Sequence, residues 1–321
     1  MRRLLATTAA LAVVGAGLVV GTGGTAPEVY AAAITPTPKA AWDASDYDGQ
    51  ALTADAADLD GGLPDVHGVY VYPSDQPSRF GTYAAYFQAE QKRATTMLSS
   101  ATGLGFRWDE RAAADGSRLH DITVVRAKAN LRSLSSSKQF GLVVDALKAA
   151  GLTDPDKKYY VWLDAKSTNC GQGQSSSDTV RSSANAANRT GVAVSYRPTG
   201  GEETYAANGG WCNPVTHELL HTFGAVNPAA PHYVAGGHCV DDNQDTMCNA
   251  NTAGIPPFDA SKPRTIDTNN DDYLDPSADL AQPETAGKLA GWTINLSRFL
   301  CPRSTSDRTK PDCSQPNSPV Y

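Results

Sequence analysis

The sequence predicts one mixed α/β domain, because stretches with strand patterning and stretches with helix patterning alternate along the chain. Runs of alternating apolar and polar residues indicate strands, whereas apolar residues three or four positions apart indicate helices. No internal repeat interrupts this order. We expect, in order, a strand at 67–72, a helix at 82–100, strands at 105–108 and 120–125, a helix at 137–150, strands at 159–163 and 191–196, and a last helix near 286–299.

Each of these elements has a local signal. The helix at 82–100 places aromatic residues among Lys, Gln and Glu, and the helix at 137–150 ends at Gly151, a residue favoured at helix ends. The continuous apolar run 159–163 predicts a buried strand. The alternating run 191–196 is set in a stretch rich in Ser, Asn and Gly and predicts an edge strand.

Composition excludes several classes of protein. The 321 residues carry a net charge of −7, and 40% of them are hydrophobic. Such a chain is too apolar to be disordered throughout and too acidic for a nucleic-acid-binding protein. Since no basic stretch favours an anionic membrane surface, we expect no nucleic-acid partner and, after removal of an export signal, no membrane contact.

The N-terminus has the pattern of a secretory signal peptide. Two arginines follow Met1, then an uncharged apolar run, and small residues end it at Ala31 to Ala33. The sequence therefore predicts a secreted, extracellular protein. We expect a signal peptide at 1–33, an acidic leader or short pro-segment at 34–66, and a folded domain at 67–321.

The cysteines agree with export. All six lie in the expected mature part, and an even number in an exported chain predicts three disulfides that staple its C-terminal part. The chain has no C-x-x-C pair, which disfavours a thiolate zinc site. We expect the pairs Cys170–Cys212, Cys239–Cys248 and Cys301–Cys313, the last two because they close short loops.

Residues 217–221 read His-Glu-Leu-Leu-His. On a helix, two histidines four positions apart share one face, so both imidazoles can reach one zinc ion. Glu218 lies one position round the helix, where its carboxylate can take a proton from a metal-bound water. Four of the six histidines lie between His217 and His238, and this clustering favours a metal centre over two unrelated histidines.

The segment 217–248 resembles the metzincin clan of zinc endopeptidases, whose pattern is H-E-x-x-H-x-x-G-x-x-H/D followed by a methionine turn. Gly224 stands at the glycine of that pattern, and Met247 stands where the methionine turn is expected. The segment is also similar to exported bacterial proteins of the reprolysin-like or metzincin-like kind. The resemblance implies a twisted mixed sheet with an antiparallel edge strand, an active-site helix and the Met-turn.

The sequence departs from the metzincin pattern at the third zinc ligand, where Asn227 stands, because an amide is a poor zinc ligand. A catalytic zinc needs three protein ligands and one open position. We expect His232, in the run Ala-Pro-His, to supply the third. His238, Asn227, Asp241 and Asp242 also stay open as candidates for this ligand. If neither histidine is a ligand, an inactive relative is expected.

The resemblance implies a zinc endopeptidase with one catalytic Zn²⁺, held by His217, His221 and His232. Glu218 would act as the general base on the metal-bound water and would then protonate the leaving amine. The expected partner is a protein or peptide substrate, extended along the edge strand 191–196 and cleaved by a monomer.

Two further functions stay open. An inactive metzincin-like binding or adhesion module is suggested by Asn227 and by Asn249, which stands where some metzincins have Tyr. A zinc hydrolase of a non-peptide bond also fits, because the motif alone does not define the bond that is cleaved.

Residues 267–275 alternate oxygen-bearing side chains as a calcium loop does, which makes Ca²⁺ a second cofactor hypothesis. The loop lacks the glycine and the final glutamate of an EF-hand, since Asp272 and Ala278 stand there. A polar turn that caps the last helix is the competing interpretation.

Overall fold

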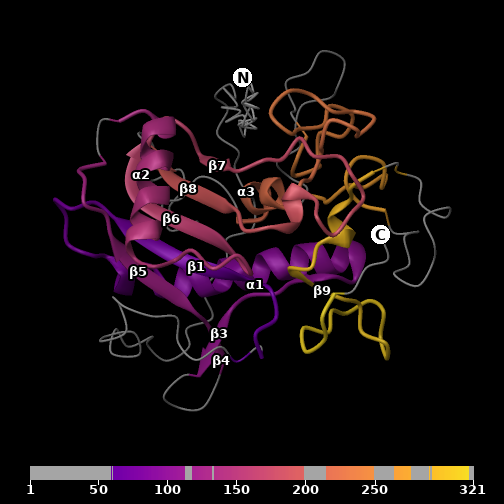
Figure 1. Cartoon of the computed structure of the whole chain (residues 1–321), viewed down its shortest axis with the longest axis horizontal. Coiled ribbons are helices and arrows are strands. Elements are labelled where there is room, and N and C mark those ends of the chain that lie inside the picture. Colours follow the sequence, from indigo (N-terminus) through magenta and orange to yellow (C-terminus); the bar gives the residue numbers. More distant parts are fainter. Residues whose placement is uncertain are drawn as a thin grey trace, which may run out of the picture.

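The computed structural model describes residues 59, 61–112, 118–131, 134–198, 215–248, 264–275, 289 and 291–317. The expected signal peptide and residues 34–58 and 60 of the expected leader lie outside these residues, whereas residues 65 and 66 belong to the first strand of the domain. Within them the protein is a mixed α/β structure, with a five-stranded, mostly parallel sheet and three α-helices (Figure 1). The fold class expected from the sequence is confirmed at this level.

The sheet has the strand order β5-β1-β6-β8-β7. Neighbouring strands run parallel except at the end of the sheet, where β7 pairs antiparallel with β8. The strands are β1 at Asp65–Tyr72, β5 at Ile122–Arg126, β6 at Lys157–Ser167, β7 at Gly171–Gly173 and β8 at Val192–Pro198.

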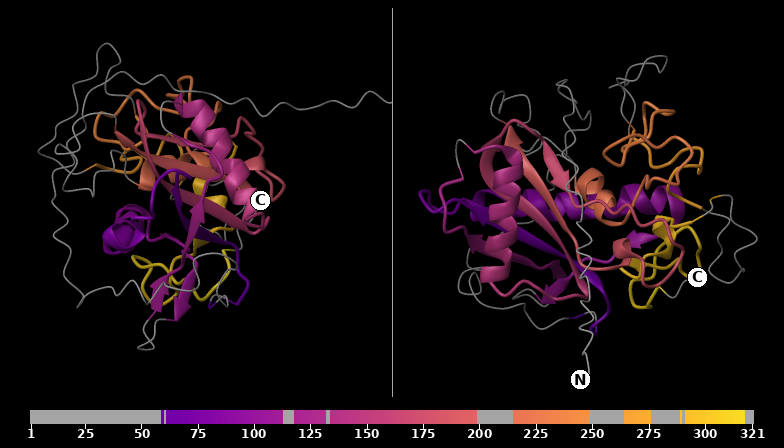
Figure 2. Two further views of the ribbon diagram at one scale, coloured as in Figure 1. Left: turned by 90° about the vertical axis from the view of Figure 1, so that its left-hand side faces the viewer. Right: turned by 45° about the horizontal axis from the view of Figure 1, so that its top comes forward.

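Helices cover both faces of this sheet (Figure 2). Helix α2 (Ser136–Ala149) packs on one face, whereas α1 (Phe80–Thr102) and α3 (Val215–Thr222) pack on the other. Alternation along β1 supplies both cores, because Tyr70 lies in the cluster with α1 and α3 while Val69 and Val71 lie in the cluster with α2.

Smaller elements complete the described part. Two short antiparallel pairs are formed by β2 (Gly105–Phe106) with β9 (Leu300–Cys301) and by β3 (Glu110–Ala112) with β4 (Arg118–His120). Short 3-10 helices are η2 (Ala186–Asn188) and η5 (Ile294–Leu296). Among the described residues, none of the helices is long and apolar enough to cross a membrane.

The expected disulfides agree with the structure where it describes both partners. Cys239 is bonded to Cys248, and Cys301 is bonded to Cys313. Cys170 is also in a disulfide, whereas Cys212, its expected partner, lies outside the described residues.

Two predictions about elements were wrong. The strand expected at 191–196 is present as β8, but β7 covers it and forms the edge in its place. The expected helix near 286–299 is absent from its described part, which holds only η5. Thr293 and Asn295 are poor helix formers, and Asn295 instead exchanges hydrogen bonds with the backbone of Asp275.

Candidate metal centre

Helix α3 presents two histidines on one face. The ring centroids of His217 and His221 are 4.9 Å apart, as the four-residue spacing predicts. The Nδ1 of His217 lies 2.5 Å from the backbone carbonyl oxygen of Thr246. Because a carbonyl can only accept, Nδ1 must carry the proton, which leaves the Nε2 lone pair of His217 available as a ligand.

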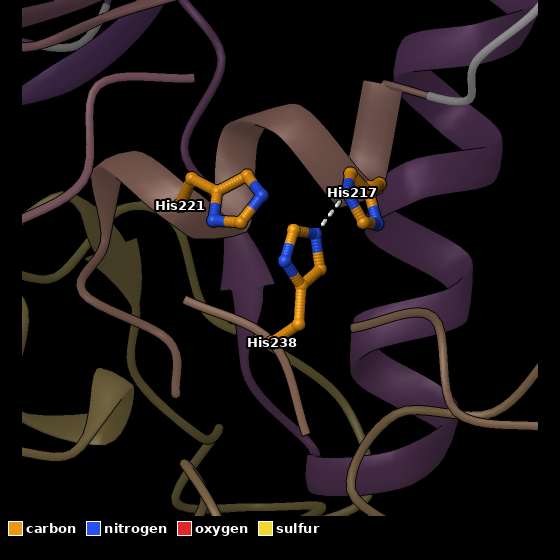
Figure 3. Close-up of side chains that lie close together, drawn as sticks. All are labelled: His217, His221 and His238. Carbon is orange, nitrogen blue, oxygen red and sulfur yellow. Dashed lines mark hydrogen bonds between the residues drawn. The ribbon is translucent and has the colours of Figure 1, made fainter. Parts of the chain in front are cut away.

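The third imidazole in this group belongs to His238 (Figure 3). Its Nε2 lies 3.4 Å from the Nε2 of His217, and its ring centroid lies 4.9 Å from that of His221. One ring nitrogen from each of the three histidines lies within 4.8 Å of the others. Three imidazole nitrogens at this spacing could hold one zinc ion.

Local backbone geometry brings His238 to this place. Gly236 and Gly237 have φ values of 100° and 76°, which residues with side chains rarely adopt. A Cβ on Gly237 would lie 3.2 Å from the Nδ1 of His221, so a glycine allows the loop to approach the helix closely. The disulfide Cys239–Cys248 then ties the next residue to the segment that contains Met247.

The structure does not place His232, the expected third ligand, with the two helix histidines. The Nδ1 of His232 instead faces three carboxylates, at 3.2 Å from Asp272 and 3.4 Å from Asp241. Asn227 and Asp242 are also separate from the three histidines. Asn227 is buried and donates to the carbonyl of Trp292, and Asp242 accepts the backbone N–H of Gln244.

Glu218 lies beside the histidine cluster and is only 4% exposed. Its Oε1 is 3.9 Å from the Nε2 of His217. Strand β7 packs directly on this side chain, since a Cβ on Gly171 would lie 2.4 Å from the Glu218 Oε1. A Cβ on Gly173 would lie 2.4 Å from the backbone oxygen of Glu218. Only glycines fit at these two positions of the edge strand.

Burial controls the charge of the helix histidines. Removal from water lowers the pKa of His217 to about 4, against a smaller raising effect of the hydrogen bond to Thr246. Burial, and then the neighbouring imidazoles His217 and His238, lower the pKa of His221 well below its usual value. Both rings are therefore neutral at neutral pH, which is the form that binds a metal.

The methionine segment lies next to the cluster and is held by a buried carboxylate. Met247 is fully buried, and its N–H donates to Asp245. Asp245 also accepts from the hydroxyl of Tyr273 and from the backbone N–H of Asp267. This network positions Thr246, whose carbonyl orients His217. In the sequence, Asp245 and Thr246 belong to the segment that resembles the Met-turn but had no predicted role, and the two glycines of β7 were not singled out.

The expected calcium loop forms a polar turn in the structure. The carboxylate of Asp267 accepts backbone N–H groups from residues 271–274 of its own loop. Its oxygens therefore satisfy the turn, and among the described residues Asp267 belongs to none of the clusters of His, Cys, Asp and Glu ligand atoms. The helix that this turn was expected to cap is not formed in its described part.

Compared with protein-family models and with curated proteins, the sequence matches none of either.

Proposed function

We propose that this protein is a secreted zinc endopeptidase of the metzincin kind, with His217, His221 and His238 as the zinc ligands. The observation that carries the proposal is the convergence of three imidazoles beside Glu218. Two of these imidazoles come from the His-Glu-Leu-Leu-His helix, and the third comes from a loop that the disulfide Cys239–Cys248 ties to the segment containing Met247.

The residues fit a zinc ion on three grounds. The donor atoms are imidazole nitrogens, which suit zinc, and burial keeps the helix histidines neutral. The Nδ1 of His221 is buried without a hydrogen-bond partner, although buried polar atoms are normally satisfied. When bound, zinc would lower the pKa of a coordinated water and polarise a substrate carbonyl.

Glu218 supplies the proton transfers in this proposal. Its carboxylate is held by β7 next to the histidine nitrogens, so it can accept a proton from the attacking water and donate it to the leaving amine. The substrate backbone would pair with β7, because β7 and not β8 ends the described sheet on this side. Export is supported by the disulfides, which persist in oxidising surroundings.

The test is a Glu218→Gln variant of the purified chain, with metal content and casein hydrolysis measured on the same samples. We expect the variant to keep its zinc and to lose about 10²–10⁴-fold in kcat/KM, the usual contribution of a general acid–base. Glu110→Gln, at a site that is 28% exposed and pairs with Arg118, is the matched control and should keep full activity.

Each outcome separates one function from the rest. Activity retained in Glu218→Gln would refute the role of this carboxylate. Zinc in a wild-type chain that cleaves no peptide but hydrolyses an ester would favour the non-peptide hydrolase, and zinc without either activity would favour the binding module.

A further inference from the structure

A second group of ligand-type side chains lies outside the three-histidine centre. One ligand atom each of His232, Asp241, Asp271 and Asp272 lies within 4.8 Å of all the others. The side chain of Asp272 is only 3% exposed, whereas that of His232 is 36% exposed. The group shares no residue with His217, His221 or His238, so it does not depend on the proposed peptidase site.

Among the described residues, no protein cation balances the charges in this group. Three carboxylates face a single imidazole, and the carboxylates of Asp241 and Asp272 contact each other directly. Within the described residues, no Lys or Arg pairs with any of them. A buried carboxylate beside a second carboxylate is costly unless a proton or a metal ion stands between them.

The position of the His232 imidazole also favours a cation in this group. The Nδ1 of His232 lies 3.2 Å from Asp272, 3.4 Å from Asp241 and 3.9 Å from Asp271. Although the side chain is partly exposed, its Nδ1 atom is buried and makes no hydrogen bond. A ring nitrogen that faces three carboxylate oxygens without bonding to them has the arrangement of a ligand around a cation, since each atom can then offer its lone pair to a common centre.

We propose that His232, Asp241, Asp271 and Asp272 form a second metal site, for a divalent transition-metal ion such as Zn²⁺ or Mn²⁺. One imidazole with carboxylate oxygens suits these ions, whereas Ca²⁺ takes oxygen ligands. The site links two loops. His232 and Asp241 flank the turn that carries His238, whereas Asp271 and Asp272 belong to the 264–275 segment. A bound ion would hold the His238 loop against that segment.

The test is a count of zinc by mass spectrometry on the full chain, after zinc loading and removal of free metal. We expect two zinc ions per chain in the wild type and one in both Asp271→Asn and His232→Ala. Asp271 is 38% exposed, so its isosteric replacement should fold, which a thermal melt checks. Asp242→Asn is the matched control: it is next to the proposed ligand Asp241, loses the same charge as Asp271→Asn, and should keep two zinc ions.

The outcomes also separate this site from the three-histidine centre. A wild-type count of one or none, or a count of two that neither Asp271→Asn nor His232→Ala lowers, would overturn the second site. If the single zinc that Asp271→Asn retains is lost in the double variant with His238→Ala, both sites are occupied as proposed. If His238→Ala alone leaves the count at two, the proposed peptidase centre fails while the second site stands.

Discussion

Burial decides which histidine side chains are neutral in this protein. Removal from water lowers the pKa of His120 to about 4, with a smaller opposing effect from Glu110, and the pKa of His217 falls to a similar value. The unfolded chain binds these protons with a pKa near 6.5. Between these two values the unfolded state therefore holds more protons at His120 and His217 than the folded state does, so protonation of these two rings favours unfolding.

For the zinc-free protein, we predict that the contribution of His120 and His217 to the free energy of unfolding is constant above about pH 7 and falls as the pH drops from about 6.5 to 4. His120→Phe should remove about 2 kcal/mol of this loss, because Phe keeps a ring next to Trp108 and takes up no proton. Urea titrations of both proteins at pH 7.5 and pH 4.5 measure the difference. An equal loss of stability in the two proteins would contradict the assignment.

The sequence predicted that His232 would join His217 and His221, whereas the structure places His238 beside them. The spacing of His217 and His221 specified one helix face, and the structure has them there. The third histidine depends on a loop path, which is determined by two glycines with positive φ and by the disulfide of Cys239. The run Gly-Gly-His-Cys was the available signal, because it marks a tight turn next to a covalent tie.

At the scale of elements, the edge strand β7 determines how Glu218 is held. Gly171→Ala would place a methyl group on the Glu218 carboxylate, at 2.4 Å from Oε1. We predict a loss of about 10²-fold in kcat/KM with zinc retained, because a displaced general base is poorly aligned with its water. Peptide hydrolysis and metal content, measured together, check this.

The control for this substitution is Gly141→Ala in α2, where an added Cβ meets nothing within 4 Å. It should leave activity unchanged and raise stability by about 0.5–1 kcal/mol, since alanine favours a helix interior. Full activity in Gly171→Ala would show that β7 does not constrain Glu218.

Strand β7 also explains a failed prediction. The sequence Gly-Gln-Gly contains no strand-forming side chain, so the pattern of alternation could not reveal it. These glycines are required because α3 packs closely against β7. This contact joins segments far apart in the sequence, so a local pattern does not reveal it. The longer elements, such as α1 and β6, were predictable because their apolar periodicity matches the core that they enter.

At the scale of the whole molecule, a buried arginine joins the C-terminal segment to the sheet. Arg107 is only 1% exposed and donates to four backbone carbonyls, those of Pro64, Arg298, Leu300 and Gln315. The sequence did not predict this role, because the acceptors are backbone atoms far along the chain. One of the four acceptors, Arg298, lies in the segment 286–299 that was expected to form a helix.

We predict that Arg107→Met lowers the free energy of unfolding by about 3 kcal/mol, because four carbonyls lose a charged donor. Limited proteolysis should then cleave first within 291–317. The control is Arg126→Met, which removes an exposed hydrogen bond to the backbone carbonyl of Ser74. It should lower the free energy of unfolding by less than about 1 kcal/mol. Equal stability of the two variants would show that Arg107 does not anchor the C-terminal segment.

In the proposed function, His238 completes with His217 and His221 the metal centre of a peptidase. The most direct test is the restoration of casein hydrolysis when zinc is added back to chelator-treated wild type, His238→Ala and His232→Ala. We predict that added zinc restores activity in the wild type and restores it in His232→Ala to within about tenfold of the wild-type value. In His238→Ala, activity should stay at least about 10³-fold below the wild-type value, because a zinc ligand is lost. Full activity in His238→Ala, or an inactive but folded His232→Ala, would contradict the assignment of His238 as the third zinc ligand.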